Sequence, residues 1–388
     1  MTLNNDLSIM PDHARPPIST EDFDLSPVRL VDAAATDETV SLFAFLRGIA
    51  GRYIMFGHQN DTTESVVTNA AGGSDTFAAV GAYPAVFGIG VRMNASELIA
   101  IAKDIHAKNG IVTLEDHMPN FTSGGSFYDM TPCVEHILPG GKDHAKFVAR
   151  LDATADFANG FKDDSGKLVP VIYRPFHENS GNWFWWGSTT STREQYIALW
   201  HFTVRYLRDE RGVRNFLYAY SPNGHFKDEA DYLDRYPGDD FVDLIGMDIY
   251  DDRPEYGSGW MEATMLDARI LVGIAESRGK VAALTEAGLR WNAEDGLKPS
   301  GNTVPDWFSL LHRTLSEDPV ASKIAYMLTW RNDNPGDGPP RHFWVPFRGH
   351  PVYGDHEMVD EFVKYYNLDT VLFADRLRGQ FDLKVRKV

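Results

Sequence analysis

Residues 170–187, with the sequence PVIYRPFHENSGNWFWWG, contain an apolar run that ends abruptly in charged and aromatic residues. A short, nearly continuous apolar run bounded by proline is typical of a strand that is buried on both faces, as in a parallel sheet. A histidine, a glutamate and three tryptophans follow the run almost at once. The stretch therefore predicts a buried parallel strand that delivers polar side chains to one edge of its sheet.

Seven other runs along the chain have the same character, and helical patterns separate them. The eight predicted strands are Arg52–His58, Tyr83–Gly90, Ile111–His117, Pro170–Glu178, Asn215–Asn223, Asp243–Asp251, Val281–Gly288 and Ile324–Asn332. The clearest predicted helices are Ser96–Asn109, with Ser96 as its N-cap, Asp143–Asn159, Ser191–Arg211, Gly259–Arg278 and Asp306–Glu317.

Strands that alternate with helices eight times predict an α/β fold, a closed (β/α)8 TIM barrel in a single domain. A doubly wound open sheet is the competing architecture, and it would usually place a phosphate-binding glycine loop after a strand. The nearest match, Gly273 with Gly279-Lys280, has the wrong spacing for such a loop. We expect residues 26–388 to form the catalytic barrel and residues 1–25 to form a flexible tail.

Composition limits the partners of this chain. The 388 residues carry 37 basic and 55 acidic side chains, a net charge of −18, which repels a phosphate backbone and argues against nucleic-acid binding. Apolar runs fall short of the roughly 20 residues that a membrane span needs. The single cysteine, Cys133, excludes an intrachain disulfide and a cysteine-based metal site. The negative charge does not exclude neutral substrates.

The N-terminus leaves the compartment unknown. Residues 1–25 lack a basic segment followed by an apolar one, so we identify no signal peptide. We expect a cytoplasmic protein if this N-terminus is native, and a secreted or periplasmic one if a leader was removed.

Chemistry in such a barrel lies at the carboxyl ends of the strands. Strand side chains alternate between faces, so Arg174, Phe176 and Glu178 are expected to share one face and to point into the barrel mouth. Indole rings pack well against the C–H face of a sugar, and their N–H groups reach hydroxyls. We therefore interpret Trp183 as a ligand platform. Trp185 and Trp186 are equally compatible with a core cluster under the loop.

A second carboxylate, Glu286, ends the seventh strand in the segment Leu284–Gly288, LTEAG. Strands four and seven lie on opposite sides of an eight-stranded ring, so Glu286 is expected to face Glu178 across the mouth. Two carboxylates about 5–5.5 Å apart are what retaining glycoside hydrolysis needs. We interpret Glu286 as the nucleophile, held ionised by Arg174 and the Tyr250 hydroxyl, and Glu178 as the acid/base.

These motifs resemble glycoside hydrolase family 26, whose best-known members are endo-β-1,4-mannanases. The likeness covers most of residues 40–370, and the segment around the fourth strand, with histidine directly before the acid/base, is its most specific part. The matching segments are Arg174–Gly187 (RPFHE…WFWWG), Thr285–Gly288 (TEAG), Gly57–Gln59 (GHQ), the second strand, Met247–Asp251 (MDIYD) and Leu328–Trp330 (LTW).

The resemblance implies a retaining barrel enzyme that cleaves β-1,4-mannosidic bonds in mannan, galactomannan, glucomannan or manno-oligosaccharides. It also implies that His177 hydrogen-bonds Glu178, and that Phe127 and Tyr128 replace tryptophans found in many mannanases. Asp243 and Asp248 are weaker candidates, since both are equally compatible with structural roles. The residues implied to line the subsites at the cleaved bond are His117, Trp183, Tyr250 and Trp330.

Other functions remain open from the sequence. Mixed-linkage β-glucan and β-1,3-xylan are the alternative substrates, because some family members act on them. A metal-dependent barrel hydrolase would use His58, His117, His177 and Glu178, although the His-x-His spacing common in such barrels is absent. A non-catalytic glycan-binding barrel is the third alternative, and the presence of both carboxylates argues against it. No cofactor and no metal is implied, because protonation and carboxylate attack need neither.

Overall fold

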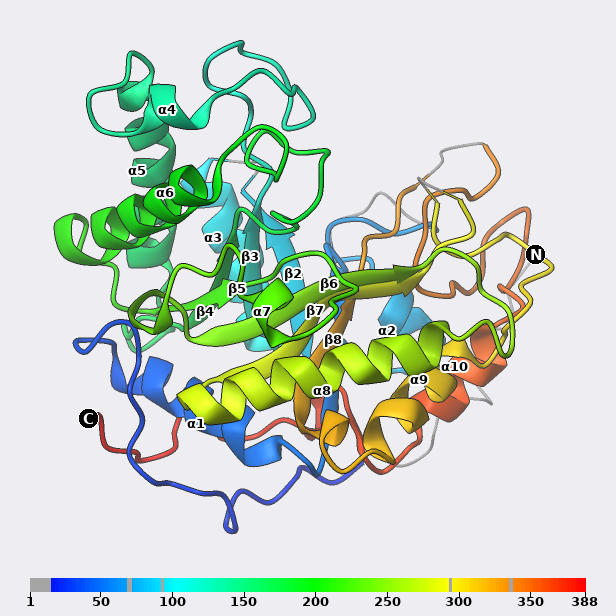
Figure 1. Ribbon diagram of the computed structural model, residues 1–388. Coiled ribbons are helices and arrows are strands. Elements are labelled where there is room, and N and C mark those ends of the chain that lie inside the picture. Colours follow the sequence, from blue (N-terminus) through cyan, green and yellow to red (C-terminus); the bar gives the residue numbers. More distant parts are fainter. Residues whose placement is uncertain (1–14, 68–71, 92–93, 293–294, 335–337) are drawn as a thin grey trace.

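The computed structural model describes residues 15–67, 72–91, 94–292, 295–334 and 338–388. The described residues form a closed barrel of eight parallel strands, in which β1 pairs with both β2 and β8 (Figure 1). The strands are β1 (Ile54–Gln59), β2 (Val86–Gly90), β3 (Ile111–Asp116), β4 (Val171–Pro175), β5 (Phe216–Tyr220), β6 (Leu244–Asp251), β7 (Val281–Leu289) and β8 (Ile324–Thr329), and a short β9 (Val371–Leu372) adds to β1.

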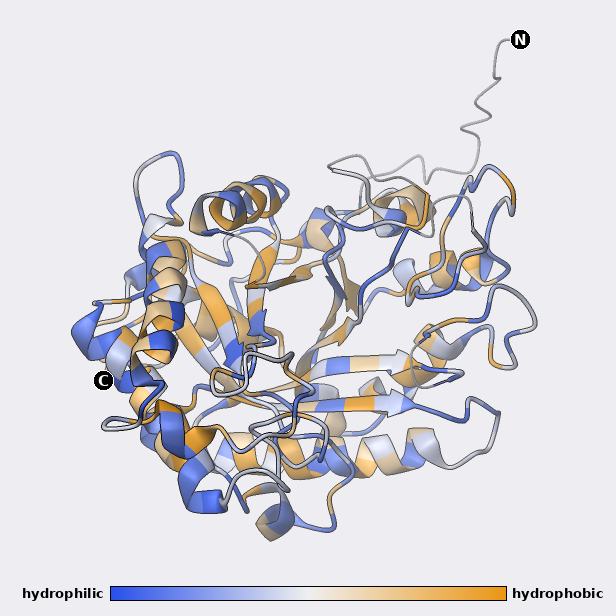
Figure 2. Cartoon of the chain, turned by 90° about the horizontal axis from the view of Figure 1, so that it is seen from above, coloured by the Kyte–Doolittle hydropathy of each residue, from blue (hydrophilic) through white to orange (hydrophobic). Residues whose placement is uncertain are grey.

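Helices surround this barrel, as the view from above shows (Figure 2). They are α1 (Asp37–Ile49), α2 (Asp75–Val80), α3 (Ala95–Ala107), α4 (Val134–Ile137), α5 (His144–Gly160), α6 (Arg193–Arg205), α7 (Glu229–Tyr232), α8 (Trp260–Arg278), α9 (Trp307–Ser316) and α10 (Val359–Tyr366). Single helical turns cover η1 (Tyr206–Glu210), η2 (Asp239–Phe241), η3 (Ala321–Lys323) and η4 (Ala374–Arg376). No helix among the described residues is long and apolar enough to span a membrane.

The structure confirms the (β/α)8 barrel, and all eight predicted strands are present within a few residues of their predicted bounds. Two local predictions for the helices were wrong. Asn94, and not Ser96, caps α3, because the Asn94 side chain accepts a hydrogen bond from the backbone N–H of Glu97. The helix predicted over Ser191–Arg211 changes to π-helical geometry from Tyr206 onward.

Helix α1 closes the end of the barrel at which the strands begin (Figure 1). Its apolar residues, such as Leu42 and Phe45, are fully buried in one cluster with residues near the strand starts, including Ile172, Leu217 and Leu244. This packing fills the lower part of the barrel with apolar side chains. Polar groups inside the barrel are thereby confined to the opposite end, where the strands finish.

The predicted N-terminal tail is described only in part, because residues 1–14 lie outside the described residues. In the remainder, Ile18 and Phe23 are buried. The Phe23 ring packs against Phe45 of α1 with ring centroids 5.7 Å apart, and the Ile18 N–H donates to the carbonyl of Arg376. Residues from 18 to 23 therefore pack on the barrel.

Phe56 of β1 ties the C-terminal elements to the barrel. Its fully buried ring contacts Phe308 of α9, Phe362 of α10 and Phe373 beside β9, at centroid distances of 6.1, 5.4 and 4.9 Å. Aromatic clusters of this kind lose both transfer free energy and packing contacts when one ring is removed.

We predict that Phe56→Ala lowers the free energy of unfolding by about 3–5 kcal/mol, because it leaves a cavity among three rings. Chemical denaturation followed by tryptophan fluorescence measures this loss. Phe56→Leu serves as the matched control and should lose clearly less, since it keeps most of the buried volume. A loss below about 1 kcal/mol for the alanine variant would contradict this role of Phe56.

Candidate active site

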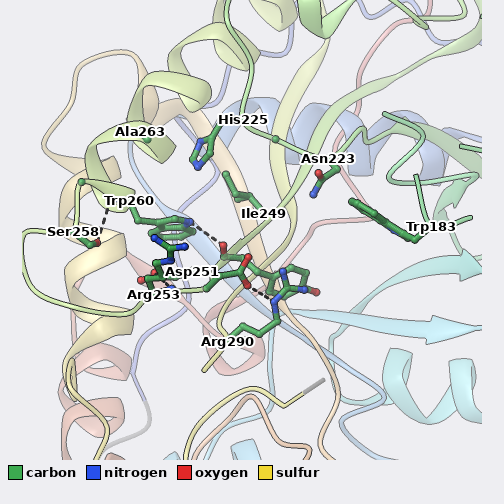
Figure 3. A pocket seen from close by; sticks show the side chains of 14 residues that line it. Trp183, Asn223, His225, Ile249, Asp251, Arg253, Ser258, Trp260, Ala263 and Arg290 are labelled. Atoms are coloured by element: carbon green, nitrogen blue, oxygen red, sulfur yellow. Dashed lines mark hydrogen bonds and ion pairs between the residues drawn. The ribbon is translucent and has the colours of Figure 1, made fainter. Parts of the chain in front are cut away.

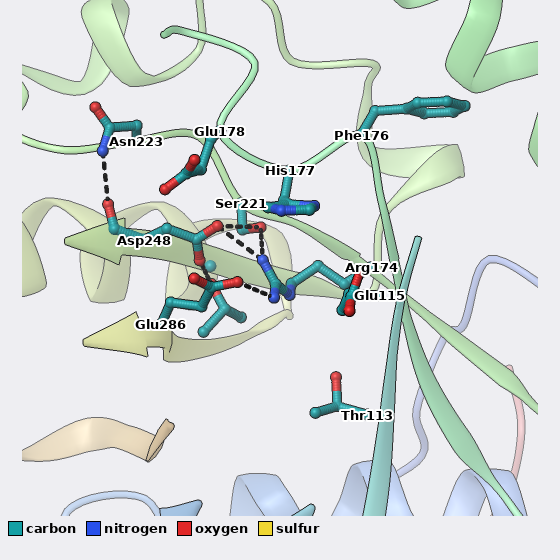
Figure 4. Close-up of polar contacts among 12 residues, drawn as sticks. Thr113, Glu115, Arg174, Phe176, His177, Glu178, Ser221, Asn223, Asp248 and Glu286 are labelled. Carbon is teal, nitrogen blue, oxygen red and sulfur yellow. Dashed lines mark hydrogen bonds and ion pairs between the residues drawn. The ribbon is translucent and has the colours of Figure 1, made fainter. Parts of the chain in front are cut away.

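The polar residues of the barrel gather at the carboxyl ends of β4, β6 and β7 (Figure 4). Arg174 lies near the end of β4, and Glu178 follows that strand directly. Asp248 lies on β6, and its partner in the strand register is Glu286 of β7. Oxygen atoms of Glu178 and Glu286 lie within 4.8 Å of each other, so the two side chains meet at one mouth, while their catalytic roles stay a prediction.

The backbone after β4 departs from the regular alternation of a strand. The strand ends at Pro175, and Phe176 and Glu178 adopt left-handed conformations with φ of +50° and +53°. Such conformations cost about 1–3 kcal/mol each in non-glycine residues and persist only where surrounding contacts enforce them. Here the Glu178 N–H donates to the carbonyl of Ser221 at 2.7 Å, and the Tyr196 hydroxyl donates to the carbonyl of Phe176 at 3.1 Å.

This turn corrects the prediction that Phe176 shares the mouth face with Arg174 and Glu178. Phe176 is fully buried and packs on Trp185 and Trp186, outside the mouth. His177 points towards Arg174 instead, as Figure 4 shows. The alternation rule fails because it assumes an extended backbone through residue 178, whereas the two left-handed residues redirect the chain.

Glu286 is almost fully buried, and both of its oxygens accept short hydrogen bonds. Arg174 Nη2 donates to Oε1 at 2.5 Å, and the Tyr250 hydroxyl donates to Oε2 at 2.5 Å. Burial opposes the charge of Arg174, but the charges of Asp248 and Glu286 outweigh it and raise the pKa of the guanidinium. Burial and the charge of Glu286 raise the pKa of the Tyr250 hydroxyl well above its ordinary value. Glu286 is thus placed beside one permanent cation and one permanent donor.

Glu178 has a different environment. It accepts a hydrogen bond from Trp183 Nε1 at 2.6 Å. Burial, together with repulsion from the charge of Glu286, raises the pKa of Glu178 to about 7, while the Trp183 hydrogen bond acts in the opposite direction. Burial and the neighbouring charge therefore let Glu178 keep its proton up to near neutral pH.

The separation of the two groups distinguishes between mechanisms. Oxygens of Glu178, Asp248 and Glu286 all lie within 4.8 Å of one another. Retaining glycosidases hold their two carboxyl groups about 5–5.5 Å apart, whereas inverting enzymes separate them by about 6.5–9.5 Å. The short separation fits direct attack by a carboxylate on a sugar carbon.

Trp183 is half-buried, and its ring lies close to the backbone of Gly181. A side-chain carbon added at Gly181 would meet the indole ring at 2.5 Å, so only glycine leaves room for this ring position. Trp185 and Trp186 are fully buried, and they donate hydrogen bonds to the carbonyls of Met118 and His177. These two tryptophans belong to the core that supports the loop.

Two histidines meet beside the carboxylates. His177 Nε2 lies 3.2 Å from His117 Nε2, and His117 Nδ1 lies 2.6 Å from Glu115 Oε2. Burial, followed by the charges of Arg174 and His117, lowers the pKa of His177 well below its ordinary value, so the ring stays neutral. The implied hydrogen bond from His177 to Glu178 was wrong, because the His177 ring is directed at His117.

Glu115 is a site residue that the sequence analysis did not identify. It also accepts a hydrogen bond from Gln59 Nε2 at 3.3 Å. Strand alternation could have identified Glu115 as an inward residue. Its neighbour Asp116 points outward from the barrel, where Arg150 Nε donates a hydrogen bond to it at 2.9 Å. The residue before Asp116 on the strand must then point inward.

The predicted aromatic residues lie on the His117 side of the site. The Trp330 ring lies 5.7 Å from His117 between centroids, and the half-buried Phe127 lies 4.6 Å from it. Tyr128 is 60% exposed and stacks on Phe184, which is itself buried. These rings surround the space next to Glu286 and Glu178 from one side.

The predicted alternative ligand set for a metal is not assembled. His58 is fully buried and lies 2.6 Å from Asp61, on a network separate from Glu178. All four oxygens of Asp248 and Glu286 already accept hydrogen bonds, from Arg174, Thr285 and Tyr250, so a cation at these carboxylates would have to displace those donors. Asp243 lies before β6, where it accepts backbone N–H bonds from Val31 and Tyr218, a structural role.

A (β/α)8 barrel with two facing glutamates in these unlike environments has the form of a barrel glycosidase. The chain belongs to glycosyl hydrolase family 26, whose family model matches residues 31–299.

Individual relatives agree with this membership. The chain is 38% identical over 324 residues to a mannan endo-1,4-beta-mannosidase of Bifidobacterium adolescentis. The aligned region covers 79% of this chain and 32% of that protein. The chain thus spans about a third of the length of this curated relative. The catalytic domain of the GH26 endo-beta-1,4-mannanase of Bacillus sp. JAMB-750 superposes with a TM-score of 0.87 at 36% identity, covering 94% of this chain and 98% of that one. A GH26 beta-mannanase from Bacteroides ovatus gives a TM-score of 0.79 at 30% identity, with 90% and 98% covered.

We predict that Trp183→Phe raises the pKa of Glu178 above about 7, because it removes the indole N–H that stabilises the ionised carboxylate while keeping an aromatic ring. The titration is followed by ¹³C NMR of labelled glutamate side chains, with Glu178→Gln used to assign the signal. A Glu178 pKa that falls or stays unchanged in Trp183→Phe would show that this hydrogen bond does not set the acidity of the group.

Proposed function

We propose that this chain is a retaining glycoside hydrolase that cleaves β-1,4-mannosidic bonds in mannan-type polysaccharides and oligosaccharides by double displacement. The observation that carries this proposal is the pair Glu178 and Glu286, within 4.8 Å of each other and in opposite electrostatic environments. The mannan specificity is supported by the names of the relatives, several of which are mannan endo-1,4-beta-mannosidases.

In the first step, an oxygen of Glu286 attacks the anomeric carbon and forms a covalent glycosyl ester. Glu178 gives its proton to the glycosidic oxygen, so that the bond to the leaving sugar breaks and the sugar departs as an alcohol. Arg174 and Tyr250 hold the attacking carboxylate ionised and oriented before the reaction. As negative charge leaves Glu286, repulsion on Glu178 falls, and its affinity for a proton decreases at the moment when it must give one up.

In the second step, Glu178, now ionised, takes a proton from a water molecule that attacks the same carbon from the side of the departed sugar. The ester bond to Glu286 breaks, and the carboxylate returns to its contacts with Arg174 and Tyr250. Two inversions give a product with the β configuration of the substrate. The side of the site that holds the bound sugar is formed by His117, Trp330 and Phe127.

The alternatives differ in substrate and in class. Mixed-linkage β-glucan and β-1,3-xylan fit the same pair of carboxylates and remain the alternative substrates. A metal-dependent hydrolase is disfavoured because Arg174, Thr285 and Tyr250 already donate to the carboxylate oxygens that a cation would need. A non-catalytic glycan-binding barrel gives no reason for the raised pKa of Glu178 beside an ionised Glu286.

One experiment separates substrates and stereochemistry together. Mannan, mixed-linkage β-glucan and β-1,3-xylan are each incubated with the protein, and proton NMR follows the first anomer released. We expect hydrolysis of mannan with the β anomer appearing first. Release of the α anomer first would exclude a retaining mechanism, and preference for either other polymer would replace the substrate proposed here.

We predict that Glu178→Ala and Glu286→Ala respond differently to the leaving group. Glu178→Ala should lose about 10²–10⁴-fold in kcat/KM on mannan, but far less on an aryl β-mannobioside with an acidic phenol, because that leaving group needs little protonation. Glu286→Ala should lose activity on both substrates, since no carboxylate is left to attack. Equal losses of Glu178→Ala on the polymer and the aryl substrate would contradict the acid role.

We predict that kcat/KM for mannan falls as the pH rises through about 7. Burial and the charge of Glu286 raise the pKa of Glu178 to about this value, and the general acid is active only while it is protonated. The decline should therefore lie on the alkaline side. A pH–rate profile in which activity still rises between pH 7 and 9 would be incompatible with Glu178 as the acid.

A further inference from the structure

A cavity of about 750 Å³ lies beside the two glutamates, over β5 and β6 (Figure 3). This volume lies within the range of about 300–1,000 Å³ that is typical of ligand sites, and it exceeds the space that one hexose fills. Trp183 and Tyr250 line its inner end, and these two residues donate hydrogen bonds to Glu178 and Glu286. Trp260, the first residue of α8, lines the opposite end (Figure 3). The cavity thus begins at the catalytic pair and leads away from it.

The lining of the cavity indicates which part of a substrate it receives. Its residues come from the segment after β4, the ends of β5, β6 and β7, and the start of α8, whereas His117 and Trp330 follow β3 and β8. The acid/base must face the oxygen of the departing sugar, and the indole bound to that acid, Trp183, lines this cavity. On the proposed function, the sugar chain that leaves therefore extends into this cavity.

Trp260 is held rigidly at the far end. Its Nε1 donates to the carbonyl of Tyr250 at 3.0 Å, and its ring lies 5.7 Å from that of Trp307 between centroids. Trp307 is fully buried and donates in turn to Asp251 Oδ2 at 3.1 Å. An aromatic ring that is already fixed and still partly exposed loses little conformational entropy when a sugar packs on it.

The polar groups of the cavity suit a neutral ligand. His225 Nδ1 pairs with the buried Asp267 at 2.5 Å, and His225 itself is 45% exposed, facing the cavity between Trp260 and Ile249 (Figure 3). Arg290 forms an ion pair with Asp252 in the same lining. Asp251 and Arg253 also line the cavity, so its two acidic side chains are balanced by two basic ones. The cavity thus presents hydrogen-bonding groups with little net charge, which suits the hydroxyl groups of a sugar.

We propose that this cavity is a second leaving-group subsite, in which Trp260 stacks on the sugar two units beyond the cleaved bond and His225 hydrogen-bonds its hydroxyls. The first leaving sugar lies between Trp183 and Asn223, and the second lies on Trp260. This inference rests on the proposed function and adds a specificity-determining residue to it. It means that the enzyme cuts oligosaccharides preferentially where at least two sugars lie on the leaving side.

The test compares Trp260→Ala with the wild type on two substrates. Mannopentaose is hydrolysed in ¹⁸O-labelled water, and mass spectrometry of the products shows which bond is cut. The second substrate is an aryl β-mannobioside, whose leaving group reaches only the first leaving-group subsite. We expect Trp260→Ala to lose about tenfold in kcat/KM for cuts that release two sugars, which corresponds to about 1.4 kcal/mol, near the upper end of what an aromatic contact is worth. The rate on the aryl substrate should change less than about twofold.

Two further variants test whether Trp260 acts by stacking on the sugar or by holding Tyr250 in place. Trp260→Phe keeps a ring but loses the N–H bond to Tyr250, so it should retain most of the wild-type cutting pattern. His225→Ala leaves Trp260 in place and should shift the pattern in the same direction as Trp260→Ala. Tyr353→Ala is the matched control, because Tyr353 is an aromatic residue that is 47% exposed and lies outside the cavity lining. This variant should change neither the cutting pattern on mannopentaose nor the rate on the aryl substrate.

The outcomes are distinguishable. An unchanged cutting pattern in both Trp260→Ala and His225→Ala, with wild-type hydrolysis of mannopentaose intact, would overturn the second subsite and leave the proposed function standing. Equal losses of Trp260→Ala on both substrates would also overturn it, because Trp260 would then act only through Tyr250. A wild-type protein that hydrolyses neither substrate would contradict the proposed function itself.

Discussion

The buried guanidinium of Arg174 is the contact on which the rest of the site depends. One nitrogen donates to Asp248 at 2.7 Å and the other to Glu286 at 2.5 Å, so a single side chain of β4 joins β6 and β7. A buried cation without partners would be costly, and two buried carboxylates without a cation would repel each other. Each of the three charges is therefore tolerated only because the other two are in place. The position of the nucleophile follows from this triad.

The same triad creates the contrast between the two glutamates. Glu286 accepts hydrogen bonds from Arg174 and Tyr250, and its charge acts on Glu178 from within 4.8 Å. Glu178 has no cation bonded to it; its described partner is the indole N–H of Trp183. Burial and repulsion together keep Glu178 protonated near neutral pH. The two glutamates thus have unlike environments because Glu286, and not Glu178, accepts a hydrogen bond from the guanidinium.

The sequence was sufficient to predict the barrel and to place both glutamates at one mouth of it. Buried parallel strands are apolar on both faces, so each appeared as a short apolar run, and the polar residues after two of them lay on opposite sides of the ring. The orientation of Phe176 was not predictable, because the chain leaves the extended conformation after Pro175 and turns through two left-handed residues. Contacts made by Ser221 and Tyr196, distant in sequence, enforce that turn.

Residues that act in pairs across the site were harder to predict. His177 was expected to contact Glu178, its neighbour in sequence, yet its ring meets His117 from another strand. Glu115 was overlooked because it precedes Asp116 and His117, and only the outward ion pair of Asp116 with Arg150 reveals which residue points inward. Sequence patterns show which face a residue occupies, but a partner on a different strand depends on register and on side-chain reach.

The division between strands and loops explains how one barrel can hold fixed chemistry and variable specificity. Arg174, Asp248 and Glu286 lie on strands whose lower ends are packed against α1, so their positions are set by the rigid part of the barrel. The aromatic rings that we propose as sugar contacts come from segments after the strands or from the start of α8. Tyr250 joins the two regions, because its hydroxyl binds Glu286 and its carbonyl accepts the N–H of Trp260. A sugar that packs on Trp260 therefore contacts a side chain whose position is tied, through one residue, to that of the nucleophile.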